Sequence, residues 1–146
     1  MKRMRHAWAL GLAVLLFAGA GSAQTPQDWI KRILDPATIG VTPPPGAAVN
    51  RKLSVDYLSK EDPPKQLVIY MMPLAQLVAA SDHFAKSLNV KPTVTGAGSE
   101  FELHKFILVG GGTYPPRAEG LTITITRSQF VDNKAQITLE YVPPKK

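Results

Sequence analysis

The sequence predicts an α+β protein, an antiparallel sheet of four to five strands covered by one amphipathic helix. Three segments in the C-terminal half alternate apolar and polar residues with the period of a half-buried strand, and the segment before them has helical spacing. The chain has 146 residues, 45% of them hydrophobic and 19% charged, which fits one ordinary folded domain. It contains no cysteine, which excludes a disulfide framework, a thiolate metal site, a cysteine nucleophile and a lipidated cysteine anchor.

The N-terminal segment has the pattern of a secretory signal peptide. Three cations lie within the first five positions, 7–20 is apolar apart from small residues, and 21–23 reads Gly-Ser-Ala. We expect cleavage after Ala23. A retained membrane anchor is the alternative, but the apolar stretch is shorter than the roughly 20 residues that span a bilayer. The mature protein is therefore expected to be periplasmic or secreted, with no integral membrane span.

Net charge gives little support to a nucleic-acid partner. The chain carries 17 Lys and Arg against 11 Asp and Glu. Removing 1–23 takes away three cations and no acids, which leaves 14 against 11, or +3. The cationic pairs at 31–32, 51–52 and 145–146 lie in separate regions without interleaved aromatics, so no nucleic acid is expected as a partner.

Residues 24–46 are predicted to form a short helix and a proline-rich connector. Thr25 can cap a helix that begins at Pro26 and places Trp29 on its apolar face, and the helix should end near Asp35-Pro36. Trp29 either packs this helix onto the later sheet or serves as a partner-binding anchor. Residues 42–46, Thr-Pro-Pro-Pro-Gly, should form a stiff extended connector.

The α+β domain proper is expected over 47–146. Residues 53–57 alternate as a half-buried strand does, and 67–72 is a continuous apolar run typical of a buried strand. Pro73 then suits the first turn of an amphipathic helix that extends to Leu88. A single helix over 65–88, kinked at Pro73, is the open alternative.

Three further strands are expected within 100–109, 121–126 and 135–141. In the first, the apolar set Phe101, Leu103, Ile107 and Val109 is predicted to face the core, which would place Lys105 on the same face. In the second, Thr122, Thr124 and Thr126 should form the solvent-facing side. They are there either because threonine favours strands or because their hydroxyls bind a carbohydrate.

The candidate catalytic chemistry rests on a few polar residues without a recognised motif. Glu100, Glu102 and His104 alternate along a strand and point to one side of it, and His83 on the helix could join them in metal or acid/base work. Ser81-Asp82-His83 contains the residue types of a catalytic relay, but consecutive helical residues diverge by about 100°. We therefore predict no catalytic residue, no metal and no cofactor. A small periplasmic hydrolase or metal-dependent enzyme using Glu102 and His104 is the alternative.

The loop 110–117 is the predicted binding site. Gly111 and Gly112 permit unusual backbone shapes, and the prolines that follow stiffen the chain around Tyr114 and Arg117, residue types enriched at binding hot spots. These features favour an exported, small, non-catalytic binding protein of the bacterial cell envelope whose partner is a protein or an envelope component. A second alternative is a structural subunit of an envelope or secretion assembly that pairs through an exposed strand edge.

Overall fold

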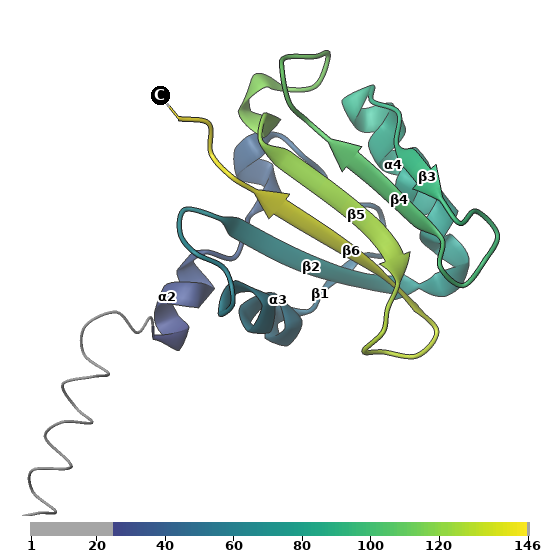
Figure 1. Cartoon of the computed structure of the whole chain (residues 1–146), viewed down its shortest axis with the longest axis horizontal. Coiled ribbons are helices and arrows are strands. Elements are labelled where there is room, and N and C mark those ends of the chain that lie inside the picture. Colours follow the sequence, from purple (N-terminus) through teal and green to yellow (C-terminus); the bar gives the residue numbers. More distant parts are fainter. Residues whose placement is uncertain (1–24, 146) are drawn as a thin grey trace, which may run out of the picture.

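The computed structural model describes residues 25–145, and the expected signal peptide at 1–23 lies outside them. The described chain forms one antiparallel sheet with strand order β1-β2-β6-β5-β4-β3 and helices on both faces (Figure 1). The strands are β1 (Ala48–Val49), β2 (Gln66–Pro73), β3 (Thr93–Thr95), β4 (Leu103–Ile107), β5 (Leu121–Arg127) and β6 (Lys134–Tyr141). The helices are α2 (Pro26–Lys31), α3 (Arg51–Leu58) and α4 (Leu77–Leu88), with 3-10 turns at Pro36–Ile39, Leu74–Gln76 and Pro116–Ala118.

The α+β class is confirmed, but the predicted number of strands was too low. The sheet has six strands rather than four to five. The two additional strands, β1 and β3, lie at the two edges and have only two and three residues, too few to show a periodic pattern. None of the described helices is long and apolar enough to cross a membrane.

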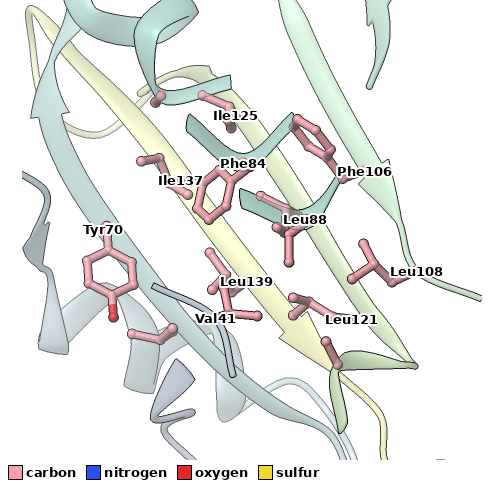
Figure 2. Packing of buried hydrophobic residues seen from close by; sticks show 14 of the residues in the cluster. Val41, Tyr70, Phe84, Leu88, Phe106, Leu108, Leu121, Ile125, Ile137 and Leu139 are labelled. Atoms are coloured by element: carbon pink, nitrogen blue, oxygen red, sulfur yellow. The ribbon is translucent and has the colours of Figure 1, made fainter. Parts of the chain in front are cut away.

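The inner face of the sheet is covered by α4, the amphipathic helix that the sequence predicts, but the predicted start at Pro73 is wrong, because Pro73 ends β2 and α4 begins at Leu77. Phe84 of α4 is fully buried and meets Phe106 of β4 edge to face, with ring centroids 6.1 Å apart (Figure 2). The rows beneath them come from β5, with Leu121, Ile123 and Ile125, and from β6, with Ile137 and Leu139. The open alternative of one kinked helix over 65–88 is wrong, because β2 pairs with β6 along Gln66–Pro73 and α4 begins only at Leu77.

Strand β2 is buried on both faces, which explains its uninterrupted apolar sequence. Val68, Tyr70 and Met72 join the main core under α4. On the opposite face, Leu67, Ile69 and Met71 form a second core with Leu58 of α3. Helix α3 therefore covers the outer face over β2. The remainder of that face, over β5, β4 and β3, carries the half-buried row Thr122, Thr124 and Thr126, as the parity of β5 predicts.

The strand predicted at 53–57 is wrong, because these residues lie in α3. The Asn50 side chain accepts a hydrogen bond from the Leu53 N–H at 3.0 Å and caps the helix. The hydroxyl of Ser54 donates to the Asn50 carbonyl and accepts from the Ile69 N–H at 2.9 Å, which ties the helix to β2. Five residues are too few to distinguish the two-residue period of a strand from the 3.6-residue period of a helix. The Asn50 cap makes this segment a helix.

The predicted orientation of β4 is also wrong. His104, Phe106 and Leu108 are buried on the inner face, whereas Phe101, Ile107 and Val109 are exposed. The odd-numbered set contains more apolar residues, but it also contains Lys105, whose ammonium would lose its hydration in the core without a partner. The even-numbered set contains His104, whose two ring nitrogens both find hydrogen-bond partners inside. The hydrogen bonds of His104 and the hydration of Lys105 therefore decide which face of β4 is buried, although the other face has more apolar residues.

The N-terminal helix is confirmed at its start and shorter than predicted at its end. The Thr25 N–H donates to the Asp28 carboxylate at 3.0 Å, and α2 ends at Lys31 rather than near Asp35. Trp29 packs against the second core, which is the structural role expected for it. The connector at 42–46 has no regular helix or strand, and the Thr42 carbonyl accepts a hydrogen bond from His83 Nε2 at 2.8 Å.

Candidate functional site

Of the four candidate residues in the loop 110–117, Tyr114 is buried and the other three are exposed. Tyr114 is 7% exposed and belongs to the main core, so it cannot act as a surface anchor in this conformation. Gly112 makes room for its ring, because a Cβ there would lie 2.5 Å from Tyr114 Cε1, and Gly111 has a φ of 75°. Arg117 is exposed, with Nη1 3.5 Å from the Thr38 carbonyl oxygen. A partner at this loop would meet Gly111, Gly112 and Arg117.

A polar cluster joins Ser81, His104 and Glu102, which are separated in sequence. His104 Nδ1 lies 2.7 Å from Ser81 Oγ, and His104 Nε2 lies 3.2 Å from Glu102 Oε2. The carboxylate can only accept, so Nε2 carries a proton; in the neutral ring Nδ1 then accepts from the Ser81 hydroxyl. The sequence predicts Glu102 and His104 as candidates, whereas it places Ser81 only beside Asp82 and His83. The pairing across 23 residues has no local sequence signal.

The cluster resembles a catalytic relay in composition but is closed to substrate. Ser81 is 2% exposed on α4. A nucleophile must reach the reacting carbon, and a hollow of about 210 Å³ beside the cluster is lined by Glu102, Val78 and Arg127 but not by Ser81. The contacts instead connect α4 with β4 and the loop before it.

Glu102 extends this connection into the β3–β4 loop. Its other carboxylate oxygen accepts the Gly98 N–H at 2.7 Å. This hydrogen bond, together with the one to His104, lowers the pKa of Glu102 below its ordinary value. His83 takes no part, because it bonds to Thr42. Within 25–145 no three His, Asp or Glu side chains are arranged to hold a metal ion.

A second candidate site is an open groove between α3 and the β5–β6 loop, here called the α3 groove. Its volume is about 520 Å³. Side chains from α3 and its ends form one wall, and the tip of the β5–β6 loop forms the other. The lining residues are Asn50, Lys52, Leu53, Asp56, Tyr57, Ser59, Lys60, Phe130 and Val131.

The β5–β6 loop presents an aromatic side chain in a defined position. Phe130 is 60% exposed, although phenylalanine is normally buried. The nearly buried Ser128 hydroxyl oxygen accepts the backbone N–H groups of Phe130 and Val131 at 3.2 and 3.1 Å. The Phe130 ring meets Tyr57 edge to face, with centroids 6.3 Å apart. The local backbone and one ring contact thus hold Phe130 at the groove.

The charged residues of the α3 groove are two lysines and one aspartate. Lys52, Asp56 and Lys60 follow one another at intervals of four, the spacing of neighbours along a helix surface, although Lys60 lies just beyond the end of α3. No ion pair joins any of the three to another described residue. The groove therefore combines an exposed aromatic wall with an excess of one positive charge.

Sequence reasoning missed this groove for two reasons. The alternation in 53–57 predicts a strand, and a strand does not place Lys52, Asp56 and Lys60 along one helical surface. Phe130 lies in a segment whose sequence predicts a connection between strands, and no local pattern there predicts that its ring is exposed. The signal that could have found it is the Ser-Gln-Phe-Val order after a strand, in which a serine hydroxyl accepts the following amides.

The chain matches no protein-family model, and the comparisons found no significant similarity to a curated protein or to a solved structure. The fold and the groove define this protein, over its described residues, as an α+β domain with an open aromatic and cationic groove.

Proposed function

We propose that this protein is a small, non-catalytic binding protein that contacts its partner through the α3 groove. The observation that supports it best is Phe130, an exposed aromatic side chain held at the rim of a groove by the Ser128 hydroxyl and by Tyr57. Holding an apolar ring in water costs free energy that is recovered when a partner covers it. A preorganised ring also loses little conformational entropy on binding.

The charges indicate what the partner carries. Lys52 and Lys60 form no ion pair with any residue of 25–145, so an anionic group can approach them without displacing a pair seen there. The proposed partner therefore offers a carboxylate or phosphate next to an apolar group. The pattern of 1–23 supports export, and we place the partner, a protein or another component, in the bacterial cell envelope.

Affinity capture from a bacterial envelope extract tests this function. Immobilised mature protein should retain one component reproducibly. Phe130→Ser should weaken its binding by about thirtyfold, the effect of truncating a hot spot worth roughly 2 kcal/mol. Lys52→Glu with Lys60→Glu should weaken it further and reduce its salt dependence.

The matched control is Phe101→Ser, the same substitution at a phenylalanine that is 78% exposed and does not line the α3 groove. Both serine variants should unfold at nearly the parent temperature, because exposed side chains contribute little to stability. Equal retention by the parent and the Phe130→Ser variant would contradict the proposed site.

A further inference from the structure

The end of β4 and the two residues after it carry apolar side chains on both faces of the sheet, yet only the inner face is covered in the described chain. The inner side carries Phe106 of β4 and Leu108 just after the strand, both fully buried. Its outer side carries Ile107, which is 54% exposed, and the chain continues into Val109, which is 64% exposed. A strand that is apolar on both faces is typical of the interior of a covered sheet, as β2 shows in this protein. The outer side of β4 lacks such cover in the described chain.

The same stretch has backbone N–H and C=O groups that pair with no other described strand. Leu108 donates its N–H to the Leu121 carbonyl and accepts the Gly120 N–H through its own carbonyl, so its backbone faces β5. In an antiparallel ladder successive residues direct their N–H and C=O groups to opposite sides, so those of Ile107, the last paired residue of β4, point to the other edge, and the same alternation predicts this direction for Val109.

β3 does not cover this part of the edge. It pairs with β4 only at Leu103, His104 and Lys105. The chain that enters β3 comes from the inner face, where Val90 packs against the main core, and no backbone hydrogen bond joins it to Ile107 or Val109 in the described structure. Figure 1 shows β4 extending past the short β3.

The charges beside this edge distinguish between possible occupants. Lys105 on the outer face and Lys91 just before β3 are both exposed, and neither forms an ion pair with a described residue. A second copy of the chain would bring the same lysines to the contact, and like charges there oppose self-pairing, as edge lysines do in many sheets. An acidic segment would be attracted instead.

We propose that the free edge of β4 at Ile107 and Val109 receives an extended segment of another protein, with two alternating apolar residues flanked by acidic ones. The segment would exchange up to four backbone hydrogen bonds with Ile107 and Val109, and its apolar side chains would lie beside theirs on the outer face. The acidic residues would lie near Lys105 and Lys91. This contact is separate from the α3 groove and does not depend on it.

The probe is the capped peptide acetyl-Glu-Thr-Val-Thr-Val-Thr-Glu-amide, which has this pattern in either chain direction. Titrated into 15N-labelled protein, it should shift the amide signals of Ile107 and Val109 and slow their hydrogen exchange. A peptide with lysine in place of both glutamates should bind at least tenfold more weakly. The Lys105→Glu variant should lose that preference.

N-methylation separates backbone pairing from simple apolar contact. Valines beside Ile107 and Val109 must direct their N–H groups at β4, so methylating both valine nitrogens should weaken binding at least tenfold. Methylating the central threonine nitrogen, which faces away, should have little effect. Ile107→Glu should abolish the shifts, whereas Val142→Glu, at an exposed valine of an interior strand end, should leave them unchanged.

Several results would overturn the proposal. These are no binding by the acidic peptide, shifts that map to another surface, or equal binding by the valine-methylated peptide. Dimerisation of the protein alone that Ile107→Glu abolishes would assign the edge to a second copy and would overturn it as well.

Discussion

Replacing Ser81 by alanine tests whether the buried polar cluster is a structural connection. The substitution removes the hydroxyl that lies 2.7 Å from His104 Nδ1 and leaves that nitrogen buried without a partner. An unsatisfied buried polar group costs about 1–3 kcal/mol. Alanine returns roughly 0.5 kcal/mol through its higher helix propensity within α4. The expected net loss is about 1–2 kcal/mol in the free energy of unfolding.

Urea unfolding of the mature protein measures this loss. With a slope of roughly 1.5 kcal/mol per molar urea, the midpoint should fall by about 1 M while the slope stays constant. Ser87→Ala is the matched control, because Ser87 lies on the exposed side of the same helix. That variant should be as stable as the parent or slightly more stable.

The double variant Ser81→Ala with His104→Phe sharpens the test. Replacing both partners by apolar groups leaves no orphaned donor or acceptor between them, so the double variant should lose less than the sum of the single losses. A coupling free energy of about 1 kcal/mol is expected. A midpoint for Ser81→Ala within 0.2 M of the parent, a margin small on the scale of the shift above, would refute the reasoning.

Three further predictions concern the Glu102 carboxylate, the Tyr114 hydroxyl and the cleavage site after Ala23. Glu102→Gln should make the loss of stability in acid shallower below about pH 4.5. The folded-state pKa of Glu102 is lowered, so this carboxylate stabilises the fold above its ordinary pKa, and the stabilisation is lost as pH falls through the folded value. Unfolding measured across an acid titration tests this. Tyr114→Phe should keep or raise the melting temperature, because the Tyr114 hydroxyl is buried without a hydrogen-bond partner in the described structure; a marked fall would reveal a partner. Mass spectrometry of the exported protein should give a chain that begins at Gln24, and a full-length mass would contradict cleavage after Ala23.

The parts of the fold that could be predicted from sequence are those where the pattern is long and unambiguous. The continuous apolar run of β2, the alternation of β5 and β6 and the helical spacing of α4 all have their predicted structure. The cap at Thr25 also marks the start of α2 correctly. These features depend on residues that are close in sequence.

The failures occurred where a distant polar contact decided the structure. The Asn50 cap and the Ser54 bond to Ile69 make α3 a helix, and the partners of His104 orient β4. Ser81 and His104 are 23 residues apart, so no local pattern could pair them. The α3 groove depended on both the helix and the position of the β5–β6 loop, and it could not be assembled while α3 was assigned as a strand.

Photocrosslinking from position 130 in living cells tests the central claim, that the α3 groove contacts a partner, most directly. A photoreactive phenylalanine derivative in place of Phe130 should give one discrete crosslinked product in the cell envelope, and Lys52→Glu with Lys60→Glu should reduce its yield at least tenfold. The same derivative in place of Phe101 should give little of that product. Equal yields of that product from positions 130 and 101, or no product from position 130 above background, would contradict the assignment of the groove as the contact site.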